Sequence, residues 1–459
     1  MTAFTALPQL PHSQIANLQA LGFSSMTPVQ AATLPLILQG KDLCVQAKTG
    51  SGKTLAFGLG IMQKITVEAA HTQALVLCPT RELADQVSKF LRQLARFAAN
   101  IKIVTLCGGQ PVAAQRDSLL QPPHIIVGTP GRIRDHLERG TLHVGQCHTL
   151  VLDEADRMLE MGFRDEIDLI IRKFPGKRQN LSFSATWPAG MAQITAHLLP
   201  EAEHITVNDV SELPAIKQTF YDVAAQDKAQ LLMKIISDKQ PTAVMVFCNT
   251  RRECDQLCQE LISRQMDALA LHGDLEQRER DQVLICFAQG SCRILVATDV
   301  AARGLDINSV DLVINYQLAF DPEVHIHRIG RTARAGTQGE AVSLVSQDEV
   351  PRALALEEMQ QKNLEWCDST SWRQVQIKPL PATKSTLQIE GGRKAKTRPG
   401  DILGALTQDA GLLATDIGKI ESGATCSWVA IERDSTRALR GMRQLKIKGK
   451  NCRIQLISR

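Results

Sequence analysis

The sequence has no long hydrophobic run and no paired cysteine motif. No apolar stretch reaches the roughly 20 residues that a membrane-spanning helix needs. No Lys or Arg precedes Lys41, so the start lacks the positively charged region of a secretory signal. These absences predict a cytoplasmic protein with no membrane partner. The twelve cysteines form no C-x-x-C pair, and we expect reduced, mostly buried thiols and no metal site among them.

Length and composition indicate a globular protein with more than one domain. The chain has 459 residues, of which 44% are hydrophobic and 22% charged, which excludes a fibrous or disordered protein and suggests two or three domains. Residues 384–459 contain fifteen Lys and Arg against seven Asp and Glu. Their net charge is therefore +8, which leaves −4 on residues 1–383 of a chain whose net charge is +4. We expect the basic carboxyl-terminal part to contact a polyanion.

A glycine-rich segment, residues 47–54, lies between two apolar stretches, which is the strand, loop and helix context of a P-loop. Gly50 and Gly52 allow the backbone to turn its N–H groups toward a polyphosphate, and a helix beginning near Lys53 adds positive potential. Lys53 is expected to reach the β and γ phosphates and Thr54 to hold Mg²⁺. Because alanine replaces the first glycine of the pattern, a glycine-rich turn with an exposed lysine is the alternative. The predicted phosphate-binding residues are Ala47, Lys48, Thr49, Gly50, Ser51, Gly52, Lys53 and Thr54.

Acidic residues follow a short buried-strand pattern at residues 150–152. Asp153 would lie at the carboxyl end of that strand, where open α/β sheets bind ligands, and could bind magnesium through water. Glu154 could orient or deprotonate the attacking water. Taken alone, Asp153, Glu154 and Asp156 could instead favour the N-terminus of the next helix. After a P-loop, they predict hydrolysis of a nucleoside triphosphate.

Apolar runs alternate with helical stretches in two series, which predicts two α/β domains joined near residues 208–216. Only the first has a P-loop. In the second, residues 297–306 lie at a strand end and residues 327–334 open a later helix. Arg331 and Arg334 are three residues apart, so both could point from one helix face into a cleft between the domains, where arginine suits the charge of a transferring phosphoryl group. A solvated basic helix face is the alternative.

The ordered motifs of residues 1–350 resemble those of DEAD-box RNA helicases. The resemblance implies two tandem RecA-like parallel-sheet domains, ATP and Mg²⁺ as cofactors, and RNA as the partner that stimulates ATP hydrolysis. It implies catalytic roles for Lys53, Asp153, Glu154, Arg331 and Arg334, and an adenine-reading Q motif in which an upstream aromatic stacks on the base and Gln30 reads its edge. Further residues implied in ATP binding are Phe4, Phe23, Thr27, Gln30, Gly304 and Asp306. Those implied in coupling hydrolysis to strand separation are Asp156, Ser184, Ala185, Thr186 and His327, and those implied in RNA binding are Arg81, Gly109, Thr129, Arg132, Arg280 and Thr298.

The resemblance also implies a mechanism. ATP and RNA each bind across both domains, so either ligand favours a closed state that binds the other. Contacts to phosphates and sugars carry little sequence information, which makes the core indifferent to sequence. Closure bends one strand, a short duplex loses base pairs, and hydrolysis releases the RNA. An ATP-gated RNA clamp or assembly scaffold that acts by retention is the alternative, and a DNA helicase would share the P-loop but fits these motifs poorly.

After a linker at residues 379–381, the tail is predicted to form a small α+β RRM-like domain with the order βαββαβ. We expect strands at 386–390, 417–421, 425–432 and 452–457, helices at 400–407 and 435–444, and a basic loop at 392–399. The aromatic platform of such domains is degraded, so Trp428 could stack on a base or merely cover apolar neighbours. The predicted RNA contacts of the loop are Arg393, Lys394, Lys396 and Arg398, with an exposed solubilising loop as the alternative.

The tail resembles the C-terminal domain of the DbpA-type bacterial helicases through residues 392–396 and 398–402. That subfamily uses the domain to bind a hairpin of 23S ribosomal RNA during assembly of the large (50S) ribosomal subunit. The implied domains are residues 1–207, 217–378 and 384–459. No heptad seam or second interaction module is recognisable, so we expect a monomer with no obligate protein partner.

Overall fold

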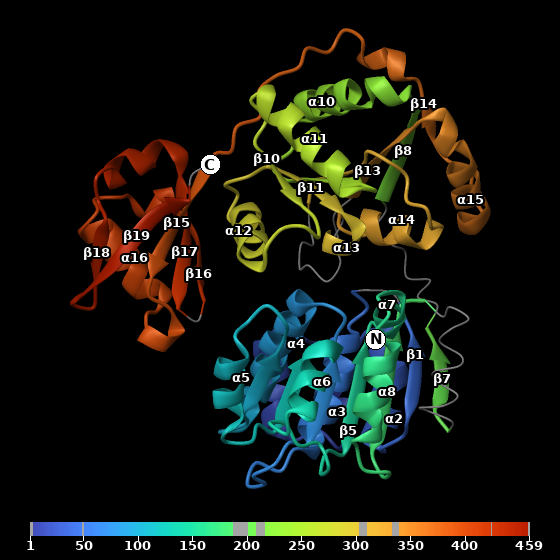
Figure 1. The fold of residues 1–459 in the computed structure, drawn as a ribbon, viewed down its shortest axis with the longest axis vertical. Helices are drawn as coiled ribbons and strands as arrows, with labels where there is room; N and C mark the ends of the chain where they lie inside the picture. The colour runs from blue at the N-terminus through green and yellow to red at the C-terminus, as the bar shows by residue number, and fades with distance from the viewer. Residues whose placement is uncertain are drawn as a thin grey trace. The chain divides into compact units, whose positions relative to one another are not determined.

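The computed structural model describes residues 3–47, 50–186, 201–207, 216–302, 310–332, 339–423 and 425–457. Its described residues divide into two compact units, the first within residues 3–207 and the second within residues 216–457. Each unit contains a seven-stranded sheet, and the second also contains a five-stranded sheet (Figure 1). Among the described helices, none is both long and apolar enough to cross a membrane.

The first unit is a parallel sheet between two layers of helices. The strand order is β3-β4-β2-β5-β6-β1-β7, with parallel pairing throughout. In the central strand β2, Val76 belongs to the core on one face and Leu75 to the core on the other, which explains its continuous apolar run. The strands are β1 (Leu43–Gln46), β2 (Ala74–Leu77), β3 (Ile103–Leu106), β4 (Ile125–Gly128), β5 (Thr149–Asp153), β6 (Gln179–Ser184) and β7 (Glu203–Thr206). The helices are α1 (His12–Ala20), α2 (Pro28–Leu38), α3 (Lys53–Lys64), α4 (Arg81–Leu94), α5 (Val112–Leu119), α6 (Pro130–Glu138), α7 (Ala155–Glu160) and α8 (Arg164–Arg172).

The second unit repeats this architecture with the strand order β10-β11-β9-β12-β13-β8-β14, again with parallel pairing. The two sheets confirm the fold class predicted for residues 1–350. The strands are β8 (Ile216–Asp222), β9 (Val244–Cys248), β10 (Ala268–Leu271), β11 (Ile294–Thr298), β12 (Leu312–Asn315), β13 (Gly339–Val345) and β14 (Trp366–Cys367). The helices are α10 (Lys228–Lys239), α11 (Arg251–Ser263), α12 (Gln277–Ala288), α13 (Asp299–Ala302), α14 (Pro322–Ile329) and α15 (Val350–Gln360).

The tail forms the five-stranded antiparallel sheet, in the order β16-β17-β15-β19-β18, with an apolar core beneath it to which α16 contributes. Its elements are β15 (Lys384–Glu390), α16 (Pro399–Gln408), β16 (Ile417–Ser422), β17 (Cys426–Glu432), β18 (Gln444–Ile447) and β19 (Lys450–Ile457). The predicted α+β domain is confirmed.

One predicted element of the tail is wrong. Instead of a helix over 435–444, the chain forms a 3-10 helix at Arg433–Leu439 and then the additional strand β18. Gly441, with φ +83°, turns the chain between them. Leu445 and Ile447 are buried while Gln444 and Lys446 are exposed, and this period of two is that of a strand.

None of the twelve cysteines, all of which lie in described parts of the chain, is in a disulfide. Nine are buried, and Cys367, Cys426 and Cys452 are half-buried. Burial raises the pKa of Cys147 to about 12, so at neutral pH this side chain is a thiol and not a reactive thiolate.

Candidate active site

The P-loop connects β1 to α3. Gly50 and Gly52 have φ values of +82° and +93°, in the left-handed region that glycine adopts without strain. Lys53 begins α3, is 6% exposed, and donates from Nζ to the carbonyl oxygen of Ala47 at 2.7 Å. The helix N-terminus and the lysine therefore converge on one loop, which is the arrangement that binds phosphate. Lys48 and Thr49, also predicted to bind ATP, lie outside the described residues.

The predicted Q motif braces this loop. Thr27 is the N-cap of α2, and its Oγ1 donates to the carbonyl oxygen of Ser51 at 2.7 Å. Gln30 is 2% exposed; its Nε2 donates to the carbonyl oxygen of Gly52 at 3.1 Å and its Oε1 accepts from the Thr27 N–H at 3.0 Å. A Cβ atom on Gly52 would clash with that Nε2. The position of the P-loop is thus tied directly to α2.

The two aromatic residues implied in adenine binding lie in apolar surroundings. Phe4 is 3% exposed and belongs to the core of the first unit. Phe23 is half-buried and packs edge-to-face on Phe90 of α4, with ring centroids 6.0 Å apart. Stacking of either ring on adenine stays a prediction.

The predicted catalytic carboxylates lie at the end of β5 and immediately after it. Asp153 is its last residue and is 4% exposed. Burial raises the pKa of Asp153 to about 7, and Glu154 and Asp156 add to the rise while Lys53 opposes it. Glu154 has φ +52° and ψ +53°, a left-handed conformation that is strained for a residue with a side chain and that clusters at functional sites. The end of β5 positions the Asp153 carboxylate, and the strained turn positions that of Glu154.

Asp156 joins this segment to the Ser184–Thr186 motif. Its Oδ2 accepts hydrogen bonds from the Ala185 N–H at 3.1 Å and from the Thr186 N–H and Oγ1 at 2.9 Å each. Burial alone would raise the pKa of Asp156, but these hydrogen bonds and the charge of Lys53 leave it below its ordinary value. The residues predicted to couple hydrolysis to strand separation within the first unit are therefore in direct contact.

The four residues predicted to contact RNA from the first unit lie past the carboxyl ends of β2, β3 and β4, which are neighbours in the sheet. Arg81 begins α4, and its guanidinium lies against Gly109, where a Cβ atom would clash with it. Thr129 is the N-cap of α6, and Arg132 lies in the first turn of that helix. The structure thus brings all four to one edge of the sheet.

Sequence reasoning missed the residues that position Arg132. Gln115, on α5, is 5% exposed; its Oε1 accepts from Arg132 Nη1 at 3.0 Å and lies 3.1 Å from Nε2 of His136. His136 is fully buried, and burial lowers its pKa, with the charge of Arg132 adding to the effect. No motif marks Gln115 or His136, because their role arises only when α5 and α6 pack together.

In the second unit, an open pocket of about 870 Å³ lies at the carboxyl ends of β9 and β11. Thr298, predicted to contact RNA, lines it together with Thr250. Sequence reasoning missed two arginines of the lining, Arg251 and Arg252, although their place in the first turn of α11 after a strand was a usable signal. Arg280 lies on α12 and donates from Nη2 to the carbonyl oxygen of Ala301 at 2.7 Å.

The expectation that residues 327–334 open a helix is wrong. Helix α14 begins at Pro322, behind the N-cap Asp321, and ends at Ile329 with Gly330 as its C-cap. Arg331 consequently follows the helix and shares a small recess with His327, Arg328 and Asp299. The predicted residues Arg334, Gly304 and Asp306 lie outside the described residues.

Hydrogen bonds hold the basic loop of the tail at both of its ends. The Gly391 N–H donates to the carbonyl oxygen of Thr425 at 2.9 Å, and the buried Ser427 donates from Oγ to the carbonyl oxygen of Gly391 at 2.7 Å. The carboxylate of Asp401 accepts from the Arg398 N–H and from Lys448 Nζ, both at 2.8 Å. The four predicted RNA contacts all lie exposed on this fixed backbone: Arg393, Lys394, Lys396 and Arg398.

Trp428 is half-buried in β17, opposite Gln388 and Glu421 of the neighbouring strands. Val429, next in the strand, belongs to the core beneath the sheet, so Trp428 lies on the other face. Its ring lies against Gly423, where a Cβ atom would come within 2.8 Å. Trp428 therefore lies on the sheet face on which RRM-like domains display aromatic residues, and base stacking by it stays a prediction.

A parallel-sheet domain with a P-loop and an Asp-Glu-Ala-Asp turn at its carboxyl edge, followed by a second such domain without a P-loop, defines the class of ATP-dependent helicases. Comparison with family models agrees. DEAD/DEAH box helicase matches residues 27–194, Helicase conserved C-terminal domain matches residues 227–336, and DbpA RNA binding domain matches residues 386–456.

Known relatives define the family further. The chain is 54% identical over 458 residues to the ATP-dependent RNA helicase DbpA of Escherichia coli (strain K12), covering 100% of both chains. It is 42% identical to the DEAD-box ATP-dependent RNA helicase CshA of Geobacillus kaustophilus (strain HTA426), covering 80% of this chain and 78% of that one. The chain belongs to the DbpA family of DEAD-box ATP-dependent RNA helicases.

Solved structures agree with this family. Dbp5 of S. cerevisiae, bound to RNA and ADP BeF3, superimposes with a TM-score of 0.74 at 30% identity, over 82% of this chain and 98% of that one. Mss116p bound to ssRNA and AMP-PNP gives a TM-score of 0.71 at 27% identity, over 80% of this chain and 79% of that one. The predicted activity, an RNA helicase that uses ATP, is confirmed.

Proposed function

We propose that this helicase destabilises short duplexes of 23S ribosomal RNA during assembly of the large ribosomal subunit, and that its tail selects the RNA. The observation that carries the proposal is the exposed basic loop at residues 391–398, which is hydrogen-bonded at both ends and lies inside the part of the chain that matches the DbpA RNA binding domain. Because the backbone of the loop is already held by hydrogen bonds, binding to a phosphate backbone has to order only the four exposed cationic side chains and not the loop as well. We further propose that the functional parts are residues 1–207, 217–378 and 384–459.

In the first part, we propose that Lys53 neutralises the β and γ phosphates and that Glu154 activates the attacking water. Magnesium would be held by Thr54 and Asp153, largely through water. Their chemistry fits this ion, because both offer oxygen ligands and because the buried Asp153 carboxylate, with its pKa raised to about 7, would gain a compensating charge. The bound ion would supply electrostatic stabilisation of the transferring phosphoryl group.

For the remaining site residues, we propose that Arg331 and Arg334 stabilise charge on the transferring group, with Gly304 and Asp306 contacting the nucleotide. The edge residues Arg81, Gly109, Thr129 and Arg132 would hold the RNA backbone from the first part. From the second part, Arg280 and Thr298 would do so, and we add Arg251 and Arg252 because they line the same pocket as Thr298.

Removal of the tail tests the targeting. Leu380 and Ala382 are buried against the second parallel-sheet domain, so the shortened chain should end after Thr383. We expect it to retain ATP hydrolysis stimulated by unstructured RNA and to lose its preference for 23S ribosomal RNA, read out by crosslinking to total cellular RNA with and without the tail. An equal distribution of crosslinks from both proteins would show the targeting assignment to be wrong.

A further inference from the structure

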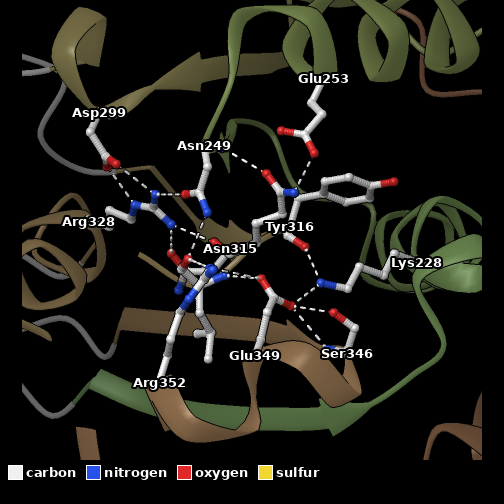
Figure 2. Close-up of polar contacts among 12 residues, drawn as sticks. Lys228, Asn249, Glu253, Asp299, Asn315, Tyr316, Arg328, Ser346, Glu349 and Arg352 are labelled. Carbon is white, nitrogen blue, oxygen red and sulfur yellow. Dashed lines mark hydrogen bonds and ion pairs between the residues drawn. The ribbon is translucent and has the colours of Figure 1, made fainter. Parts of the chain in front are cut away.

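Buried and half-buried polar residues form a continuous network along the carboxyl edge of the second parallel sheet (Figure 2). Asn249, Asp299, Tyr316 and Ser346 each directly follow the last residue of a strand, namely β9, β11, β12 and β13. These four strands are consecutive in the sheet order. Because the carboxyl ends of parallel strands meet at one edge, residues far apart in the sequence become neighbours there.

One centre of the network is Arg328 of α14, which is 1% exposed. Its Nε and Nη2 donate to the two oxygens of Asp299 at 2.6 and 2.7 Å, and Nη2 also donates to Asn249 at 2.8 Å. Nη1 donates to the Gln317 carbonyl oxygen at 2.6 Å and, less closely, to Asn315 at 3.4 Å. All the N–H groups of the guanidinium are thereby directed at acceptors from three strand ends. Lysine offers no such fork.

The other centre is a buried ion pair between Lys228 at the start of α10 and Glu349 just before α15, whose side chains are 4% and 3% exposed. Lys228 also donates to the carbonyl oxygen of Tyr316 at 3.0 Å. Glu349 accepts from the Leu318 N–H at 2.9 Å and from the N–H and Oγ of Ser346 at 3.1 and 2.9 Å. Both members of the pair therefore hold the loop that follows β12.

The two centres meet in that loop, residues 316–318. Gln317 gives its carbonyl oxygen to Arg328, and its side chain accepts from the Asn249 N–H at 2.8 Å. Leu318 gives its N–H to Glu349, and its carbonyl oxygen accepts from Asn249 Nδ2 at 2.9 Å. A shift of the loop away from the ion pair would consequently move the acceptor of Arg328 and the partner of Asn249 together.

We propose that Lys228 and Glu349 are positioning residues for RNA-stimulated ATP hydrolysis. By fixing the loop at 316–318 they fix Arg328, which holds both Asn249 in the lining of the open pocket and the end of α14 that leads to Arg331. The inference rests on the proposed roles of that pocket in RNA binding and of Arg331 in hydrolysis. If so, the network joins the pocket proposed to bind RNA to Arg331, proposed to act on the nucleotide. RNA and nucleotide would then act on the same rigid part of this domain.

Stability alone does not account for this ion pair. A buried pair is often no more stabilising than apolar residues of the same volume, because desolvation of both charges offsets their attraction. The pair supplies what apolar residues lack, which is a set of fixed acceptors and a donor for the backbone of the loop. That is the property a positioning role requires.

The test is the full-length double variant Lys228→Met with Glu349→Gln, which removes both charges and keeps an acceptor for the Leu318 N–H. We expect KM for ATP and the RNA concentration for half-maximal stimulation each to rise about tenfold, while ADP binding stays unchanged because the P-loop lies in the other unit. The matched control is Lys239→Met with Glu340→Gln, which removes a more exposed pair of the same domain, joined at 2.6 Å, and should change neither constant.

A second variant, Arg328→Lys, keeps the charge and loses the fork, and is measured in case the double variant fails to fold. We expect the same paired change of both constants, and no further change when the two sets of substitutions are combined. A lower unfolding temperature with both constants unchanged, or a change in only one of them, overturns the proposal. Pocket variants such as Arg252→Ala are measured beside them, and an unchanged RNA response there would instead overturn the RNA-binding assignment.

Discussion

The side-chain amide of Gln30 donates a hydrogen bond to the carbonyl oxygen of Gly52 at 3.1 Å, joining α2 to the P-loop. The side-chain oxygen of Gln30 also accepts a hydrogen bond from the Thr27 N–H. The loop that would bind the phosphates is therefore held in place by residues outside the P-loop motif. A residue implied to read adenine is therefore in position to change the P-loop when the base binds.

We expect Gln30→Ala to raise KM for ATP about tenfold, because it removes the two hydrogen bonds by which this side chain ties the half-buried Gly52 carbonyl of the P-loop to the Thr27 N–H of α2. The fall in kcat should be smaller, since Lys53 and Glu154 are untouched. Steady-state ATPase measurements at saturating RNA provide the check, with Gln39→Ala, an exposed glutamine at the end of the same helix, as the control. Equal KM values in variant and wild type would show that the brace does not matter for binding.

Asp156→Asn tests the contact between the DEAD segment and Ser184–Thr186. The amide has the size of the carboxylate but carries no charge, and its NH2 group cannot accept a hydrogen bond. It must therefore face either the Ala185 and Thr186 donors or the Arg157 N–H, and it leaves that side without an acceptor. We expect strand displacement to fall about tenfold, with a smaller loss of RNA-stimulated ATPase. Both rates are measured on one duplex. A proportionate loss of the two rates would argue against a coupling role.

Glu154→Gln distinguishes a helicase cycle from an ATP-gated clamp. The amide cannot accept a proton from water, so we expect ATP hydrolysis to fall by about a hundredfold or more while binding of ATP and RNA persists. Lys53→Ala should weaken nucleotide binding as well, which makes it the companion variant. If large-subunit assembly in cells proceeds normally with Glu154→Gln, retention rather than turnover is the useful activity.

Replacement of Lys394 and Lys396 by alanine should weaken ribosomal RNA binding and flatten its salt dependence. Two lost phosphate contacts lower the slope of log affinity against log salt by about 1.5. Affinities at four or more salt concentrations give the slope. Lys446→Ala with Lys450→Ala removes the same charge from exposed positions of the β18–β19 hairpin and serves as the control. An unchanged slope in the loop variant would favour a solubilising loop.

His325 should make the second unit less stable in acid. Burial, with the positive charge of Arg328, lowers its pKa to about 3 from an ordinary value of 6.5. Between these values the unfolded chain binds a proton that the folded chain does not, so the free energy of unfolding falls as the pH falls below 6.5. At pH 5 this histidine should account for a loss of about 2 kcal/mol.

Urea unfolding of wild type and His325→Gln at pH 7.5 and pH 5 measures this difference. The neutral amide removes the titration, and the exposed His12→Gln is the control. The same pH dependence in wild type and His325→Gln would mean that other groups carry the acid sensitivity.

The strand, glycine-rich loop and helix of the predicted nucleotide site could be predicted from sequence because their parts are local. Gly50, Gly52 and Lys53 lie in one short loop, and the backbone that they require is encoded by the residues themselves. The end of α14 was misjudged because residues 327–334 read as one motif, while Gly330 ends the helix in the middle of it. In the tail, a stretch of helix-compatible residues hid the alternating burial of β18.

The network around Arg328 could not be predicted from the sequence, for a different reason. Lys228 and Glu349 are 121 residues apart, and neither has a neighbour in the sequence that points to a buried charge. Only the order of strands in the sheet brings them to one loop. Gln115 and His136 are likewise ordinary residues until α5 and α6 meet. Motifs in the sequence therefore mark candidate ligand-binding groups, while the residues that hold those groups in place emerge only from the fold.

The burial of the cysteines makes the protein suited to site-specific fluorescent labelling. Maleimide dyes react with thiolates, and burial keeps thiols such as Cys44 and Cys147 protonated and enclosed, with pKa values of about 12. A cysteine introduced at Leu120, which is 77% exposed, and another at Ile262, 45% exposed, should react far faster than the nine buried native ones. With the half-buried Cys367, Cys426 and Cys452 replaced, such a dye pair would report movement of the two units during ATP turnover while the nine buried cysteines stay in place.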